Sequence, residues 1–373
     1  MDKLKIMSVF GTRPEAIKMA PLIKELQSQT WCDPKVVVTG QHREMLDQVL
    51  DIFDIDPDYD LNIMSQGQTI FDITSRVLNG FGDILKKENP DMVLVHGDTT
   101  TTFAAAMAAF YCQIPIGHVE AGLRTWNKYS PFPEEMNRQM TDDLSDLYFA
   151  PTSQSKENLL RENKADDAIY VTGNTAIDAM KFTISENYQN PILSSNGSSV
   201  RRLLVTMHRR ENLGTPMENV FTAIKEIAHD FEDVEIIFPM HKNPAVRDLA
   251  KKVLGNNTRI HLVEPFDVVD FQNILSRCHI VLTDSGGIQE EAPSLGVPVL
   301  VLRDTTERPE GIQAGTVKLI GTNRKLVYDA VSTLLTDSSE YDRMAHAENP
   351  YGDGKASKKI VSVIAEYFEK HIH

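Results

Sequence analysis

Two apolar, strand-like runs in the first third of the chain each lead directly to an acidic residue. Met92–His96 is followed by Gly97 and Asp98, and Ile116–Val119 is followed by Glu120. Open α/β sheets build their sites at the carboxyl ends of their strands. A carboxylate there is costly to bury without a partner, so two of them within about one βα unit predict acid/base chemistry.

The acids of this region differ in how easily a structural role would explain them. Asp98 could simply cap the helix expected within the threonine run that follows it. Glu120 has no obvious capping role, because the small residues Ala121 and Gly122 come after it. Glu134 lies in the first turn of a predicted helix, where the helix macrodipole alone would explain an acid. From the residues themselves, Glu120 is therefore the clearest candidate.

The segment after the first predicted strand suits an anion. Arg13 and Lys18 lie near the expected start of a helix, in Gly-Thr-Arg-Pro-Glu-Ala-Ile-Lys. An ordinary strand-to-helix turn with Pro14 in its first turn and solvated cations is an equally good interpretation. The segment matches neither GxGxxG nor GxxxxGK[ST], so the dinucleotide and ATP fingerprints are absent from the place where they should stand.

A second candidate anion site lies in the other half of the chain, where Asp284-Ser-Gly-Gly follows an apolar strand and opens a helix. Ser285 and the amides of Gly286 and Gly287 could cradle a diphosphate, and Glu291 could accept hydrogen bonds from ribose hydroxyls. The alternative is a plain cap by Asp284 or Ser285, with the glycines there for close packing. We favour the ligand, because two glycines destabilise a helix unless the backbone must approach something.

Histidines end two further predicted strands in this half. His208 is followed by Arg209 and Arg210, a cluster that suits a leaving phosphate. His241 ends the next strand, and a lone histidine in that position is more often a hydrogen-bonded scaffold residue than a catalyst.

The elements that must position these residues alternate between apolar runs and segments of helical period. This pattern predicts an α/β fold of two Rossmann-like, doubly wound parallel sheets facing across a cleft. A turn-rich segment at 189–199 separates two similar series. We therefore predict a domain at 1–190 and a second one at 191–350, with the ligand between them. The predicted strands are Ile6–Phe10, Val36–Thr39, Met92–His96, Ile116–Val119, Leu147–Ala150, Ile169–Thr172, Leu203–Met207, Val234–Pro239, Ile260–Val263, Ile280–Thr283, Val297–Leu302 and Val317–Ile320.

Composition narrows the class of protein. At 373 residues the chain exceeds the size at which one core usually stops growing. A net charge of −15 argues against a general nucleic-acid or anionic-membrane binder. The three cysteines have no metal or disulfide spacing, and no apolar run is long enough for a membrane span. We expect a cytoplasmic protein that binds no metal.

Taken together, the motifs resemble the non-hydrolysing bacterial UDP-N-acetylglucosamine 2-epimerases over nearly the full length. The motifs are Gly11-Thr-Arg-Pro-Glu-Ala-Ile-Lys18, His96-Gly-Asp-Thr-Thr-Thr-Thr102, His118-Val-Glu-Ala-Gly-Leu-Arg124, His208-Arg-Arg-Glu-Asn212, Thr283-Asp-Ser-Gly-Gly-Ile-Gln-Glu-Glu-Ala292 and Arg303-Asp-Thr-Thr-Glu-Arg-Pro-Glu310. The resemblance implies a glycosyltransferase-B-type fold, a homodimer, and a C-terminal helix at 351–373 that crosses back to the first domain.

The resemblance also implies an activity that needs no cofactor. UDP-GlcNAc and UDP-ManNAc would interconvert by anti-elimination of UDP to 2-acetamidoglucal and re-addition, for surface polysaccharide or wall polymer synthesis, inside a cleft that we expect to close. The matching catalytic residues are Asp98, Glu120, Glu134 and His208. The matching UDP contacts are Arg13, Lys18, Phe271, Ser285, Gly286, Gly287 and Glu291.

Some bacterial members of that family also bind a second UDP-GlcNAc as an activator. The matching positions are Gln41, His42, Glu134, Arg209 and His241. One position departs from the pattern, because Gly67 stands where some relatives have an arginine. Three rival functions remain at this point: a hydrolysing epimerase, a glycosyltransferase of the same fold, and a non-catalytic UDP-sugar sensor.

Overall fold

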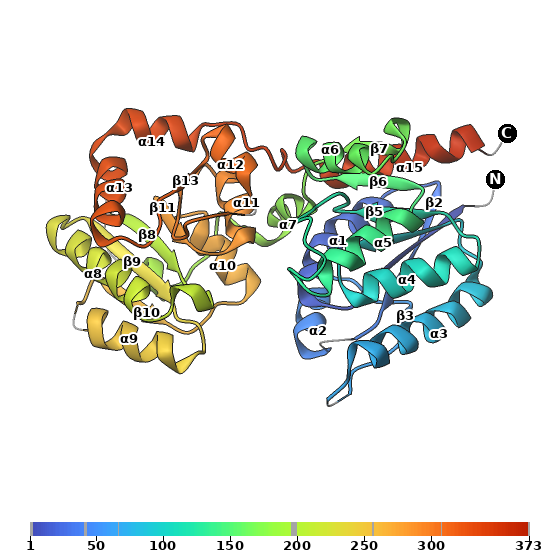
Figure 1. Ribbon diagram of the computed structural model, residues 1–373, viewed down its shortest axis with the longest axis horizontal. Helices are drawn as coiled ribbons and strands as arrows, with labels where there is room; N and C mark the ends of the chain where they lie inside the picture. Colours follow the sequence, from blue (N-terminus) through green and yellow to red (C-terminus); the bar gives the residue numbers. More distant parts are fainter. Residues whose placement is uncertain are drawn as a thin grey trace. The chain divides into compact units, whose positions relative to one another are not determined.

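The computed structural model describes residues 3–40, 43–65, 67–194, 200–255, 257–306 and 308–371. The chain divides into two compact units (Figure 1). Unit 1 comprises Met1–Phe182 and Tyr351–His373, and unit 2 comprises Thr183–Pro350. Within the described residues, no helix is both long enough and apolar enough to cross a membrane.

The described residues of unit 1 form a seven-stranded sheet with the order β3-β2-β1-β4-β5-β6-β7. Neighbouring strands are parallel throughout. The strands are β1 (Leu4–Phe10), β2 (Cys32–Val38), β3 (Tyr59–Asp60), β4 (Met92–His96), β5 (Ile116–Val119), β6 (Leu147–Ala150) and β7 (Ile169–Val171).

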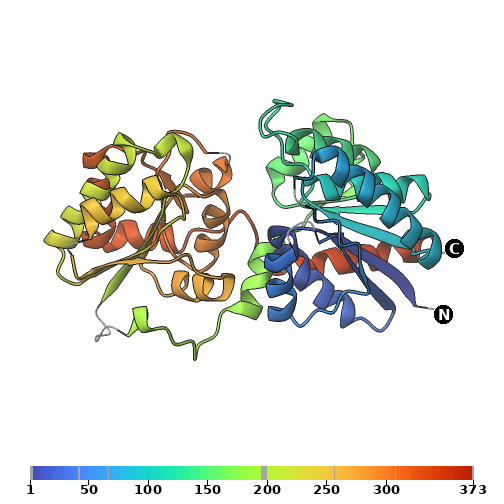
Figure 2. The same cartoon turned by 90° about the horizontal axis from the view of Figure 1, so that it is seen from below.

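Helices cover both faces of this sheet (Figure 2). Because side chains alternate along a strand, Ile6 and Phe10 of β1 face one core while Met7 and Val9 face the other. Buried on both faces, such strands are apolar along most of their length, as in β4 from Met92 to Val95. The helices are α1 (Arg13–Gln27), α2 (Arg43–Ile52), α3 (Ile70–Glu88), α4 (Thr100–Tyr111), α5 (Glu134–Leu144), α6 (Ser153–Arg161) and α7 (Thr175–Thr183), with a 3-10 turn at Asp166–Ala168.

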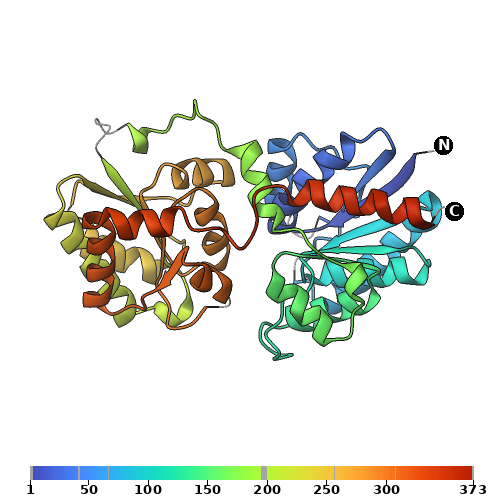
Figure 3. The ribbon, with the colours of Figure 1, turned by 90° about the horizontal axis from the view of Figure 1, so that it is seen from above.

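The C-terminal helix α15 (Ala356–His371) belongs to unit 1 (Figure 3). Ile360, Ile364 and Phe368 on one face of α15 join the core formed by α1, β1 and β2. This spacing of four residues places the three side chains on one stripe of the helix. The last part of the chain is therefore packed with the first.

The described residues of unit 2 form a six-stranded parallel sheet with the order β10-β9-β8-β11-β12-β13. The strands are β8 (Arg201–Thr206), β9 (Val234–Pro239), β10 (Ile260–Val263), β11 (Ile280–Thr283), β12 (Val299–Val301) and β13 (Val317–Leu319). The helices are α8 (Thr215–Asp230), α9 (Pro244–Leu254), α10 (Val268–Leu275), α11 (Gly286–Ser294), α12 (Pro309–Ala314), α13 (Arg324–Thr336) and α14 (Ser338–Ala345), with 3-10 turns at Pro191–Leu193 and Arg210–Asn212.

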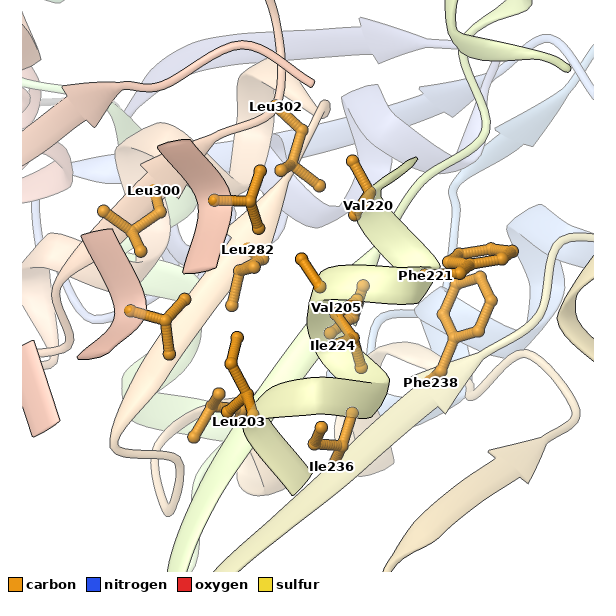
Figure 4. Close-up of a cluster of buried hydrophobic side chains, with 14 of the residues drawn as sticks. Leu203, Val205, Val220, Phe221, Ile224, Ile236, Phe238, Leu282, Leu300 and Leu302 are labelled. Atoms are coloured by element: carbon orange, nitrogen blue, oxygen red, sulfur yellow. The ribbon is translucent and has the colours of Figure 1, made fainter. Parts of the chain in front are cut away.

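A large apolar core holds one helical layer to this sheet (Figure 4). Leu203, Val205 and Leu282 from the strands meet Ile224 of α8, and the rings of Phe221 and Phe238 lie edge to face with centroids 5.2 Å apart. Such aromatic pairs add to the free energy gained by burying their area. This core is a rigid base for the loops at the carboxyl edge of the sheet.

The structure places the change of unit after Phe182, whereas the sequence indicated 190/191. Side chains just beyond Phe182 bond within unit 2: Thr183 Oγ1 donates to Gln272 Oε1, Asn273 Oδ1 accepts from Ser185 N at 2.9 Å, and Tyr188 Oη donates to Asp270 Oδ1. The turn-rich composition at 189–199 does not indicate to which unit the preceding residues bond.

Candidate functional site

The strand order of each sheet reverses at one pair of neighbours. These are β1 and β4 in unit 1, and β8 and β11 in unit 2. Loops that leave such a pair diverge to opposite faces, so a crevice opens beyond the carboxyl ends of the two strands. The segments at Gly11–Thr12, His96–Thr99, His208–Arg209 and Asp284–Gly287 all lie at these ends.

A buried carboxylate, Glu15, ties the β1 and β4 loops together in unit 1. It accepts hydrogen bonds from Gly11 N at 3.0 Å, Thr12 N at 2.7 Å, Thr99 Oγ1 at 2.6 Å and Thr102 Oγ1 at 3.0 Å. Burial raises the pKa of Glu15, although these hydrogen bonds oppose the shift. Glu15 therefore holds in place the loop that carries Arg13, which is partly exposed at the start of α1.

Glu120 follows β5 in a left-handed backbone conformation with a φ of 66°. Non-glycine residues rarely adopt this conformation, and residues held in it cluster at functional sites as well as at turns and helix ends. Its side chain is 12% exposed. Lys18 Nζ forms an ion pair with Glu120 Oε2, and Asn174 Nδ2 donates to the same oxygen at 3.2 Å. Lys18, which we expected at an anion, thus lies against the candidate base.

His96, the last residue of β4, lies beside Glu120, with Nε2 3.7 Å from Glu120 Oε2. Neither ring nitrogen has a hydrogen-bond partner among the residues that the structure describes. Burial lowers the pKa of His96 to about 3, more than the neighbouring Glu120 raises it. The imidazole is therefore neutral near pH 7.

We expect that the free energy of unfolding of His96→Gln falls less steeply with decreasing pH than that of the parent protein. Below pH 6.5 the unfolded chain takes up a proton on His96 that the folded chain refuses until about pH 3. The free energy of unfolding of the parent therefore falls by an additional amount, on the order of 1.4 kcal/mol per pH unit, in this range. Urea unfolding between pH 7 and pH 4 measures the free energy of unfolding of both proteins. If it falls equally steeply in both, His96 does not take up a proton on unfolding.

Asp98 does not cap α4, which was the simpler interpretation of this residue. Thr99 occupies the N-cap position, and its side chain accepts from Thr102 N. The Asp98 carboxylate instead pairs with Arg138 of α5, and Asn137 Nδ2 donates to the Asp98 carbonyl at 3.0 Å. The side chain is therefore held by an ion pair rather than by a helix end.

Glu134 and Glu135 begin α5 but differ in environment. Glu135 is fully buried and accepts hydrogen bonds from Thr125 N and Trp126 N, so it holds the preceding loop. Glu134 is only partly buried and makes no ion pair within the part of the chain that the structure describes. Of the two adjacent acids, Glu134 is thus the one available to a ligand.

In unit 2, Asp284 at the end of β11 organises the loop after β8. Its Oδ2 accepts from His208 N at 2.9 Å, Arg209 N at 2.9 Å and Asn212 Nδ2 at 3.0 Å. His208 Nδ1 lies 3.2 Å from Asp284 Oδ1. Burial raises the pKa of Asp284, but these contacts outweigh it and hold the pKa below its usual value. An ionised Asp284 therefore orients the His208 ring, which is 42% exposed.

The N-terminus of α11 is open. Ser285 occupies the N-cap position, yet its side chain makes no capping hydrogen bond within the described residues. Gly286 and Gly287 have neither a positive φ nor a close neighbour: a Cβ on them would meet nothing nearer than Arg308 Nη2 at 4.0 Å and Glu291 Oε1 at 3.9 Å. Close packing therefore does not explain the glycines, and the backbone amides remain accessible to an anion.

Comparison with known proteins identifies the family. A sequence model for UDP-N-acetylglucosamine 2-epimerase matches residues 24–365. The chain is 59% identical to the UDP-N-acetylglucosamine 2-epimerase of Bacillus subtilis (strain 168) over 368 residues, covering 99% of this chain and 97% of that protein. The chain belongs to the UDP-N-acetylglucosamine 2-epimerase family. It is accordingly an isomerase that acts as a UDP-N-acetylglucosamine 2-epimerase.

Two solved structures of ligand complexes support this assignment. The S. aureus MnaA–UDP structure has a TM-score of 0.87 and 54% identity, covering 98% of this chain and 97% of that one. The UDP-GlcNAc 2-epimerase from Neisseria meningitidis bound to UDP-GlcNAc has a TM-score of 0.86 and 49% identity, covering 97% and 100%. The predicted glycosyltransferase-B-type class, with two Rossmann-like domains, is confirmed.

The remaining residues predicted from the epimerase motifs divide into three groups. Phe271 is half-buried on α10, and Glu291 accepts from Gln272 Nε2 at 3.3 Å. His241 is exposed and stacks on His208, with ring centroids 5.5 Å apart, next to the partly buried Arg209. Gln41 and His42 lie outside the described residues.

Sequence reasoning missed four residues that shape this epimerase site: His96, Arg138, Asn174 and Asp284. Each contacts a predicted catalytic residue. His96 could have been found, because it ends a strand beside the one that leads to Glu120. Arg138 and Asn174 carry no such local signal. Among the described residues, no group of three or more His, Cys, Asp or Glu side chains is arranged to hold a metal ion.

Proposed function

We propose that this epimerase interconverts UDP-GlcNAc and UDP-ManNAc without net hydrolysis, by eliminating UDP and adding it back. A base removes the proton on C2 while the C1–O bond breaks, which gives UDP and 2-acetamidoglucal. UDP then returns to C1 while a proton is delivered to the other face of C2. The UDP-ManNAc formed would serve surface polysaccharide or wall polymer synthesis.

One observation carries the proposal. Asp98 and Glu120 follow the hydrogen-bonded neighbouring strands β4 and β5, but they are held by different partners, Arg138 for Asp98 and Lys18 with Asn174 for Glu120. Removing a proton from one face and delivering one to the other requires two acid/base groups. Carboxylates held in different environments meet that requirement.

Unit 2 supplies the second half of the proposed chemistry. The open end of α11, with Ser285, Gly286 and Gly287, would bind the diphosphate, while Glu291 and Phe271 would contact the ribose and uracil. The S. aureus relative has been solved with UDP and the Neisseria meningitidis relative with UDP-GlcNAc. His208, oriented by Asp284, would stabilise the charge that develops as UDP leaves. In unit 1, Arg13 and Lys18 would also bind UDP, and Glu134 would act as a further catalytic residue.

Proton NMR of the purified protein with UDP-GlcNAc in D2O tests this function. We expect UDP-ManNAc to form, deuterium to enter C2, and no free sugar to accumulate. Free ManNAc together with UDP would instead indicate a hydrolysing epimerase. An unchanged spectrum would exclude the epimerase and favour a transferase or a sensor.

Substitution of Gly286 by alanine should separate helix stability from ligand binding. The nearest atom to an added Cβ is 4.0 Å away, so the folded protein accepts the methyl group and gains about 0.5–1 kcal/mol of stability. The same methyl group would obstruct a diphosphate approaching the amides, and we expect the Kd for UDP to rise at least about tenfold, which is about 1.4 kcal/mol.

The matched control is Gly82→Ala in α3, where an added Cβ meets nothing within 4 Å. This variant should gain similar stability with an unchanged Kd for UDP. Calorimetric titration with UDP and urea unfolding measure both quantities. Equal UDP affinity in G286A and the parent would mean that α11 does not bind the diphosphate.

We also propose, from the family, that the protein is a homodimer, and sedimentation velocity tests this state. The family further suggests that a second molecule of UDP-GlcNAc activates the enzyme. His241, stacked on His208, is the described residue that connects the activator positions to the candidate site. His241→Ala and Gln41→Ala should each convert a sigmoidal dependence of rate on UDP-GlcNAc into a hyperbolic one. Hyperbolic kinetics in the parent would show that a second UDP-GlcNAc does not activate this enzyme.

A further inference from the structure

His118 is fully buried in β5, and each of its ring nitrogens faces an oxygen. Nε2 lies 2.8 Å from the carbonyl oxygen of Gly97, and Nδ1 lies 2.6 Å from Asp142 Oδ1. A carbonyl oxygen can only accept a hydrogen bond, so Nε2 carries a proton.

The second ring nitrogen carries a proton as well, because Asp142 is ionised. Arg124 Nη2 donates to Asp142 Oδ2 at 2.6 Å. Both of these side chains are fully buried, and a guanidinium that cannot lose its proton is tolerated there only beside an ionised partner. An ionised carboxylate accepts hydrogen bonds and donates none, so Nδ1 of His118 must be the donor. With a proton on each nitrogen, the ring is an imidazolium cation.

The surrounding charges balance this cation. Arg124 also donates to Glu162, the residue that follows α6, with Nε 2.7 Å from Oε1. His118 and Arg124 are thus matched by Asp142 and Glu162. The other titratable ring nearby, His96 on β4, is neutral, and the positive charge of His118 is one of the causes that lower the pKa of His96. A buried charge is tolerated when it is paired and hydrogen-bonded in this way.

The cation holds the peptide that joins β4 to Asp98. Gly97 has a φ of 69°, its N–H donates to Val119 O at 2.9 Å, and its carbonyl accepts from His118. A Cβ on Gly97 would stand 4.0 Å from Glu120 Oε1. Gly97 therefore lies between the two candidate acid/base residues and is fixed on both sides by β5.

We propose that His118, with a proton on each ring nitrogen, is a positioning residue that sets Asp98 and Glu120 in a fixed relation to each other. This inference rests on the proposed roles of those two carboxylates. It gives the motif His118-Val-Glu120-Ala-Gly-Leu-Arg124 a second purpose besides supplying Glu120. A displacement of about 1 Å at a catalytic group costs about a hundredfold in rate.

Long-range proton–nitrogen NMR of the parent protein, labelled with ¹⁵N in histidine, tests the protonation state directly. At about pH 8, above the ordinary histidine pKa of about 6.5, His118 should show a bound proton on both nitrogens. The resonance is assigned by its absence from His118→Gln. A single bound proton would overturn the inference. This result does not depend on epimerase activity, so it is separable from a failure of the proposed function.

Two variants test the positioning role. His118→Gln removes the charge and replaces the ring that reaches Gly97, and we expect kcat to fall about tenfold to a hundredfold with KM for UDP-GlcNAc changed less than about twofold. Asp142→Asn lets His118 become neutral while Nε2 still donates to Gly97, so its kcat should lie between those of the parent and H118Q. His261→Gln in unit 2 is the matched control and should match the parent.

Urea unfolding identifies whether each variant is folded under assay conditions. Wild-type kcat in a folded H118Q protein would overturn the positioning role. If H118Q does not fold, the kcat of D142N still tests the positioning role, and the change that D142N causes in the His118 resonances assigns them in the parent. D142N keeps the proton on Nε2 and therefore the hydrogen bond to Gly97. If its kcat nevertheless equals that of H118Q, this hydrogen bond does not position the catalytic residues.

Discussion

Glu120→Gln should lower kcat for epimerisation by about 10²–10⁴-fold, the usual contribution of a positioned acid/base group. Glutamine keeps the size of the side chain but cannot take up or release a proton at C2. The affinity for UDP should change less than kcat, because most of the proposed UDP contacts lie in unit 2, although Lys18 in unit 1 is paired with Glu120. Proton NMR in D2O measures the rate of deuterium entry at C2, and calorimetric titration measures UDP binding.

The control for this variant is Glu157→Gln, an exposed glutamate on α6 of the same unit. It removes the same charge from the chain without touching Lys18, His96 or Asn174, and it should behave as the parent does. If E120Q exchanges deuterium at C2 as fast as the parent, Glu120 is not an acid/base residue. The left-handed backbone at this position would then need another explanation.

Several strands were predicted with their observed bounds because each is a short apolar run with a clear stop, although β2 begins at Cys32 rather than Val36 and β12 covers Val299–Val301 rather than Val297–Leu302. The runs 92–96, 116–119 and 147–150 coincide with β4, β5 and β6. β3 was missed because Tyr59–Asp60 is two residues long and has no apolar run. The sequence suggested Asp98 as a possible cap of α4, but the neighbouring Thr99, also a good capping residue, takes that position.

The environment of each acid was not predictable, because it depends on partners that are distant in the chain. Glu15 bonds to Thr99, 84 residues away, Lys18 pairs with Glu120, 102 residues away, and Asp284 bonds to His208 N, 76 residues away. No periodicity or local composition encodes such pairs. Motif spacing therefore predicted which residues could do chemistry, whereas the sheet topology decides which side chain holds which acid.

His208→Gln should lower kcat by about 10²–10³-fold, the range seen when one donor to a developing anion is removed. His208 follows β8 at the topological switch point, and its Nδ1 lies 3.2 Å from Asp284 Oδ1. Glutamine at this position cannot become a cation, so less charge on the departing diphosphate is neutralised, while binding of UDP itself should weaken less than about tenfold. His229→Gln, an exposed position on α8, is the matched control. Single-turnover kinetics with UDP-GlcNAc separate a slower chemical step from weaker binding. If the variant binds UDP-GlcNAc more weakly but keeps its single-turnover rate, His208 acts in substrate binding alone.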